Sequence, residues 1–85
     1  MKPTTTQLYE EVAAENQKGI ENHKKTATLL EAAAKHHREA ARHHSEGNHD
    51  KAAQSTITAQ GYLSLAIETQ QEDIKHHALN DLSSN

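Results

Sequence analysis

The sequence predicts an all-α protein, folded as a long antiparallel helical hairpin, and three observations lead to this fold class. Residues that favour helices dominate the 85-residue chain, above all Ala, Glu, Gln, Lys, Leu and Arg. Proline, which interrupts helices, occurs once, at Pro3. A single strong break, Ser45-Glu46-Gly47-Asn48, divides the chain into two long segments. We therefore treat residues 1–85 as one helical domain.

The first helix is expected at about residues 4–46. Thr4 can cap its N-terminus while the side chain of Gln7 bonds back to the Thr4 backbone, which is the spacing of a capping box. Gly47 suits the left-handed backbone conformation that ends many helices. The first helix thus has a start signal and a stop signal of its own.

The second helix is expected at about residues 49–82, with Asn48 as its N-cap. A turn of only two residues, 47–48, forces the helices to pack antiparallel. Gly19 leaves an alternative open, because a helix can also end there and a new one start at Asn22, which gives three helices.

The composition allows only a thin core. Hydrophobic residues make up 33% of the chain and many of them are alanine, which buries little apolar area. The chain has no Cys, so disulfides cannot stabilise it. Domains this small usually need self-association, a metal ion or very regular helix packing.

A heptad pattern, with spacings that alternate between four and three residues, predicts which side of each helix packs on the other. The predicted seam of the first helix consists of Tyr9, Ala13, Asn16, Ile20, His23, Ala27, Leu30, Ala34, His37, Ala41 and His44. That of the second helix consists of Ala52, Thr56, Ala59, Leu63, Ala66, Gln70, Asp73 and His77. Folding the chain at Gly47 places Leu30 beside Leu63, as the one leucine pair of the seam, and His23 near Gln70.

Several large apolar residues lie outside this seam, and one hairpin cannot cover them. They are Leu8, Val12, Leu29, Ile57, Tyr62, Leu65, Ile67, Ile74 and Leu79. Such side chains on long helices usually meet another helical hairpin. We therefore expect a homodimer in the form of a four-helix bundle, with larger oligomers as an open alternative.

Two histidine pairs stand seven residues apart in the phrase AAKHHREAARHH, residues 33–44. In each pair, His37 and His44 are expected on the seam, and His36 and His43 to one side of it. A charge is costly to bury in a close-packed seam. Protonation of the seam histidines, which include His23, is therefore expected to loosen the bundle between about pH 6.5 and 5.

A first candidate metal site lies on the first helix, where the spacings of three, four and three place His36, Glu39, His43 and Glu46 on one side. Imidazole and carboxylate suit Zn, Ni or Cu ions. His36 and His43 are seven residues apart, about 10 Å along the axis, so one ion would need ligands from another helix. The alternative is a solvated stripe in which Glu39 pairs with a protonated histidine.

A second candidate site lies in the second helix, where Glu72 reaches His76 and Asp73 reaches His77 at a spacing of four. The functional interpretation is a carboxylate–histidine metal site. In the alternative, the carboxylates only stabilise the protonated histidines, whose positive charge complements the C-terminal end of the helix dipole.

Other function classes find no support in the sequence. The net charge of -3 makes nucleic acid an improbable partner, since phosphate binding needs clustered cations. Signal-peptide and membrane-span patterns are missing, so we expect a cytoplasmic protein. Nucleophilic-site and phosphate-loop motifs are missing too, and we expect no enzyme.

Two resemblances accompany these patterns. Gly47-Asn48-His49-Asp50-Lys51-Ala52 resembles the inter-helix turn of a tetratricopeptide repeat, in one copy over residues 33–66, which implies a helical hairpin. The phrases HHREAARHH (36–44) and GNHDKAA (47–53) resemble short, histidine-rich, helical bacterial proteins. That resemblance implies a helical fold and a bacterial origin.

The interpretation that fits these patterns best is a non-enzymatic, self-associating helical module for structure or interaction, with an unknown protein partner as a further option. The rival is a protein that binds a divalent transition metal through histidine and carboxylate ligands across helices.

Overall fold

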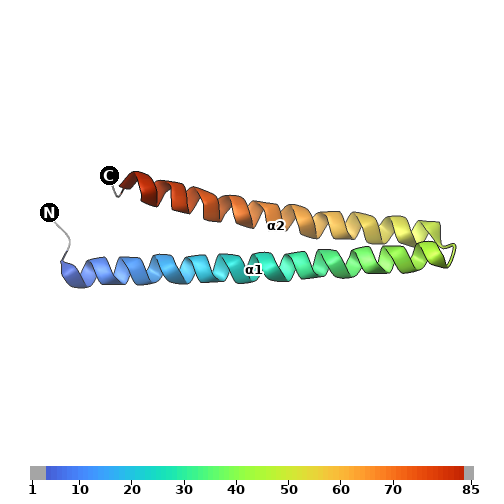
Figure 1. Ribbon diagram of the computed structural model, residues 1–85, viewed down its shortest axis with the longest axis horizontal. Coiled ribbons are helices and arrows are strands. Elements are labelled where there is room, and N and C mark those ends of the chain that lie inside the picture. The colour runs from blue at the N-terminus through green and yellow to red at the C-terminus, as the bar shows by residue number, and fades with distance from the viewer. Residues whose placement is uncertain (1–3, 84–85) are drawn as a thin grey trace.

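The computed structural model describes residues 4–83, except for the side chains of His76 and of residues 79–83. Two helices account for this stretch, α1 (Thr5–Ser45) and α2 (His49–Ser83), and they lie side by side as an antiparallel hairpin (Figure 1). The described residues contain no strand. The predicted all-α hairpin is therefore confirmed. Helix α1 continues through Gly19, so the three-helix alternative is not adopted.

Helix α1 begins at the predicted capping box. The Thr4 hydroxyl oxygen accepts a hydrogen bond from the Gln7 backbone N–H at 3.2 Å. In return, Gln7 Oε1 accepts one from the Thr4 backbone N–H at 2.8 Å. Two backbone donors that no helical carbonyl can reach are thereby satisfied, which fixes the start of the helix.

The turn between the helices has the hydrogen bonds of a Schellman motif. The Asn48 N–H donates to the His43 carbonyl at 2.8 Å, and the Gly47 N–H donates to the His44 carbonyl at 3.0 Å. Gly47 has φ 76°, a conformation that only glycine adopts without strain. The Asn48 side chain then caps α2 by accepting from the Lys51 N–H at 3.4 Å. Both turn residues act as the sequence predicts.

Small residues build the contact between the helices, which we call the inner seam. On α1 it consists of Gly19, Asn22, Thr26, Leu29, Ala33, His36, Ala40 and His43. On α2 it consists of Ala52, Ser55, Ala59, Tyr62, Ala66, Thr69 and Asp73. The most deeply buried residues, at 0% exposure, are Ala52, Ala59 and Ala66, and no large side chain in the described stretch is fully buried. Alanine therefore forms the core, as the composition predicts.

The predicted seam of α1 is wrong by one residue from Ile20 to His44, and its first positions, Tyr9, Ala13 and Asn16, are exposed. Leu30 and Leu63 remain 41% and 40% exposed, so they do not form the predicted central leucine layer. On α2 the predicted Ala52, Ala59, Ala66 and Asp73 are correct, whereas the positions between them shift by one, for example from Leu63 to Tyr62. The physical reason is close approach: alanines at the contact bring the two backbones together and leave no room for a leucine layer between them.

The hairpin is elongated rather than compact. Its principal extents are 67 × 19 × 14 Å and its radius of gyration is 19.4 Å, against about 12 Å for a compact chain of this length. Its accessible surface is 6678 Å², whereas a compact monomer of 9.4 kDa exposes about 5,000 Å². Much of the surface that a globular domain buries is thus left open.

Candidate functional site

Each histidine pair sends one ring into the inner seam and one outward. His36 and His43 are half-buried against α2, whereas His37 and His44 are exposed. The predicted roles of the two histidines in each pair are therefore wrong. His36 and His43, not His37 and His44, face α2, because the contact face of α1 lies one residue earlier than predicted. The proposed pH-sensing residues His23, His37 and His44 all lie outside the inner seam.

His36 serves as a packing group. Its ring stacks on the Tyr62 ring, with centroids 5.5 Å apart and planes only 9° from parallel. Its Nδ1 atom lies 3.3 Å from Glu39 Oε2. This is the carboxylate–histidine pairing that the solvated-stripe alternative expects.

The structure does not gather the four predicted ligands of α1 around one point. Glu46 pairs with Arg42 instead, at 3.4 Å. His43 Nδ1 is buried without a hydrogen-bond partner. Across the residues that the structure describes, no three His, Asp or Glu side chains already surround a common point as metal ligands do.

A histidine contact also bridges the turn. His44 Nδ1 and His49 Nδ1 lie 3.2 Å apart, with ring centroids at 5.4 Å and planes tilted by 57°. One nitrogen can donate to the other only while one of them is unprotonated. Double protonation would therefore turn this contact into a repulsion at the end of the hairpin.

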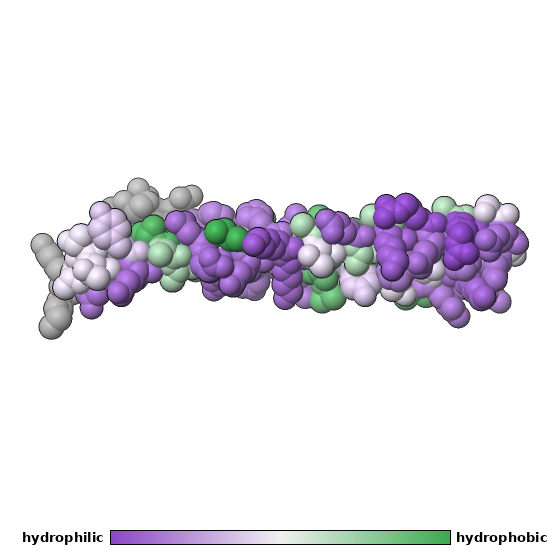
Figure 2. Space-filling model, turned by 90° about the horizontal axis from the view of Figure 1, so that it is seen from below, coloured by the Kyte–Doolittle hydropathy of each residue, from purple (hydrophilic) through white to green (hydrophobic). Residues whose placement is uncertain are grey.

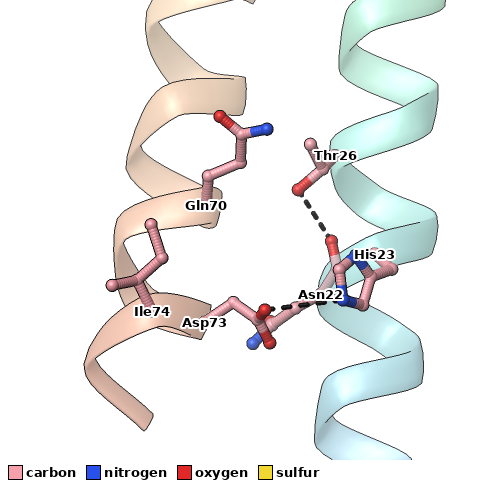
Figure 3. Close-up of a pocket in the computed structure, with 6 residues that line it drawn as sticks. All are labelled: Asn22, His23, Thr26, Gln70, Asp73 and Ile74. Atoms are coloured by element: carbon pink, nitrogen blue, oxygen red, sulfur yellow. Dashed lines mark hydrogen bonds and ion pairs between the residues drawn. The ribbon is translucent and has the colours of Figure 1, made fainter. Parts of the chain in front are cut away.

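The second cluster lies between the two helices near the middle of the hairpin, around Asp73 (Figure 3). Asp73 is only 8% exposed, and its carboxylate points from α2 toward α1. Its Oδ2 atom lies 3.4 Å from Nε2 of His23 on α1 and 3.4 Å from Nε2 of His77 on α2. A groove of about 280 Å³ surrounds this group, lined by Asn22, His23, Thr26, Gln70, Asp73 and Ile74.

The sequence identified part of this cluster. The predicted approach of Asp73 to His77 is confirmed, and His23 and Gln70 line the same groove as expected. Glu72 is exposed, and the side chain of His76 lies outside the described residues. The contact of His23 with Asp73 was missed, although the correct register would have placed these two residues across from each other.

A second stripe follows one residue after the inner seam on each helix. One residue step turns by about 100° around a helix, and because the helices are antiparallel both stripes turn toward the same broad side of the hairpin. We call this side the outer face. On α1 it consists of Ile20, His23, Ala27, Leu30, Ala34, His37, Ala41 and His44. On α2 it consists of Ala53, Thr56, Gln60, Leu63, Ile67, Gln70, Ile74 and His77.

The outer face carries no Lys, Arg, Asp or Glu, and all of its residues except Thr56 are exposed. The opposite broad side, one residue before the inner seam, is different, and we call it the charged face. It consists of Lys18, Glu21, Lys25, Thr28, Ala32, Lys35, Glu39, Arg42, Lys51, Gln54, Thr58, Gly61, Leu65, Glu68 and Glu72. Seen from the α1 side, most of the surface is hydrophilic and the hydrophobic groups form small patches (Figure 2). The two broad sides of the hairpin thus differ sharply in charge.

Comparison with protein-family models, with curated proteins and with solved structures returns no match. The resemblance to histidine-rich bacterial proteins therefore stays a prediction. No helix among the described residues is long and apolar enough to cross a membrane.

Proposed function

We propose that the protein is a non-enzymatic helical module that associates with a second copy of itself through the outer face, so that two hairpins form a four-helix bundle. The observation that carries this proposal is the contrast between the two broad sides. Nine of the fifteen positions of the charged face hold charged residues, whereas the outer face holds none. Depletion of charge is the compositional mark of the centre of a protein interface.

The available area suits a stable dimer. Each partner of a standard interface buries about 800 Å². The hairpin exposes 6678 Å², whereas a compact monomer of this mass exposes about 5,000 Å². The difference exceeds the area that one partner of a standard interface buries. The broad sides of a molecule measuring 67 × 19 × 14 Å are large enough for such a contact.

A second copy is the occupant that fits because the outer face repeats the chemistry of the inner seam. Ala27, Ala34 and Ala41 recur every seven residues, as Ala33 and Ala40 do on the inner seam. Small residues at this spacing let helix backbones approach closely. This repeat of the packing pattern supports contact of the outer face with the same face of a second copy, as in a two-fold dimer.

The outer face also accounts for the exposed members of the histidine pairs. His37 and His44 lie on it, next to the alanines of the stripe. A neutral imidazole can be covered by a second copy, whereas a protonated one loses hydration and meets like charges. Association through this face is therefore expected to weaken in mild acid.

Single cysteines test the proposal, because the chain has none of its own. Ala34→Cys places a thiol on the outer face, and Lys35→Cys places one on the charged face at the adjacent position. We expect alkylation of the first thiol to slow as protein concentration rises, because association covers it, while alkylation of the second stays constant. Equal behaviour of the two thiols in fully helical protein would contradict the assignment of the face.

A further inference from the structure

The carboxylate of Asp73 is buried, but one of its two oxygen atoms has no hydrogen-bond donor. The residue is 8% exposed, and its Oδ1 atom is buried without a hydrogen-bond partner. Removing an ionised carboxylate from water is costly unless a cation or several donors replace the lost hydration. Among the residues that the structure describes, no lysine or arginine lines the groove around Asp73. The groups that contact its Oδ2 atom are two imidazoles.

The distances from Asp73 Oδ2 to the two imidazoles are long for charge-assisted hydrogen bonds. Both imidazole Nε2 atoms lie 3.4 Å from Asp73 Oδ2, whereas a charge-assisted hydrogen bond between such groups measures about 2.7–2.9 Å. Two ligand atoms that each lie about 2.0–2.1 Å from a tetrahedral zinc ion are about 3.3–3.4 Å apart. Each spacing is thus long for a charge-assisted hydrogen bond, and it is short enough for the imidazole and the carboxylate to share one ion once a ring turns.

We propose that His23, Asp73 and His77 bind one divalent transition-metal ion, of which Zn²⁺ fits best, and that this ion ties α1 to α2 near the middle of the hairpin. Two imidazoles and one carboxylate are a ligand set that zinc accepts while a fourth position stays open for water. Amide oxygens of Asn22 or Gln70, which line the same groove, offer an alternative fourth ligand.

Binding requires one movement. Since no three such side chains in the described part of the chain already surround a common point, at least one imidazole must turn to close the site. The side chains of His23 and His77 are 75% and 67% exposed, so little packing opposes a change of rotamer. The buried Asp73 provides the fixed ligand to which the two rings adjust. All three ligands belong to one chain, so the ion needs no second copy and the site goes beyond self-association. His23 and His77 also lie on the outer face, so in the proposed dimer the second copy packs over the site.

Calorimetric titration of the full chain with ZnCl₂ at pH 7.5, in a buffer that does not bind metals, tests the proposal. We expect one ion per chain with a dissociation constant of about 1 µM or tighter. His23→Gln, His77→Gln and Asp73→Asn should each weaken binding by at least about tenfold. His49→Gln is the matched control, because it removes an exposed histidine at the turn, outside the outer face and far from Asp73, and it should leave binding unchanged.

A thermal melt provides the second readout. Zinc should raise the melting temperature of the wild type and of His49→Gln, because an ion bound only to the folded hairpin stabilises it, and should not raise that of His23→Gln. His23 and His49 are exposed, so their variants are expected to fold even if Asp73→Asn does not. Absence of binding, one ion per two chains, or equal weakening in His49→Gln would each overturn the proposal.

Discussion

Replacing Ile67 by alanine should weaken self-association, whereas replacing Leu65 by alanine should not. The two residues lie two positions apart on α2 and are similarly exposed, at 44% and 48%. Ile67 belongs to the outer face and Leu65 to the charged face. Both changes remove comparable apolar area from the hairpin itself, so their costs to folding should be similar and Leu65→Ala is a matched control.

The size of the effect follows from the exposed fraction. Isoleucine exceeds alanine by three carbon groups, each worth about 0.8 kcal/mol on full burial. Covering the exposed 44% of Ile67 therefore contributes about 1 kcal/mol per copy. A symmetric dimer contains the residue twice, which gives about 2 kcal/mol, or about a 30-fold change in the dissociation constant.

Sedimentation velocity over a dilution series measures this constant for the wild type and both variants, while circular dichroism confirms that each remains helical. We expect a shift of about 30-fold for Ile67→Ala and less than about threefold for Leu65→Ala. Equal shifts in the two variants, or a larger shift for Leu65→Ala, would refute the assignment of the outer face.

Further substitutions test the hairpin and its response to pH. Gly47→Ala should destabilise the protein by about 1 kcal/mol, because a φ of 76° strains any residue other than glycine. Gly19→Ala should stabilise it by about 0.5–1 kcal/mol, because alanine favours the helix and its methyl group meets no atom within 4 Å. Chemical denaturation measures both changes in the free energy of unfolding. Ala59→Leu should cost about 1–3 kcal/mol through overpacking, because Ala59 is fully buried in the inner seam. Association should be weaker at pH 5 than at pH 7.5, because positively charged histidines on the outer faces of two copies repel each other. Light scattering of a double variant, His37→Gln with His44→Gln, should show a smaller loss between pH 7.5 and 5, and an unchanged loss would contradict the role of these histidines.

Local signals made the hairpin predictable. The capping box at Thr4, the left-handed Gly47 and the cap at Asn48 each depend on a few neighbouring residues, and all three appear as the sequence indicates. Helix type and boundaries follow from such short-range chemistry. The backbone course was therefore accessible without any knowledge of tertiary contacts.

The contact face of α1 was not predictable in the same way. The helix has two heptad stripes one residue apart, and the stripe with Ile20 and Leu30 is the more apolar of the two. Hydrophobicity alone therefore favours the stripe that the hairpin leaves exposed. Both stripes hold alanines seven residues apart, Ala33 and Ala40 on the inner seam and Ala34 and Ala41 on the other, so the small residues that close helix approach requires do not distinguish the stripes either.

The same ambiguity limited the prediction of the Asp73 cluster. Its contact with His77 lies within one helix, at a spacing of four, and could be read directly from the sequence. Its contact with His23 crosses the hairpin and depends on the register between the helices. A shift of one residue on α1 turns a side chain by about 100°, which is enough to hide such a contact.

The mass of the protein in solution tests the central claim most directly. Sedimentation equilibrium at about 100 µM and pH 7.5 should return twice the chain mass of 9.4 kDa, or a larger multiple if hairpins stack further. Circular dichroism on the same sample should show an almost fully helical chain. A mass of 9.4 kDa in fully helical protein at that concentration would contradict self-association through the outer face.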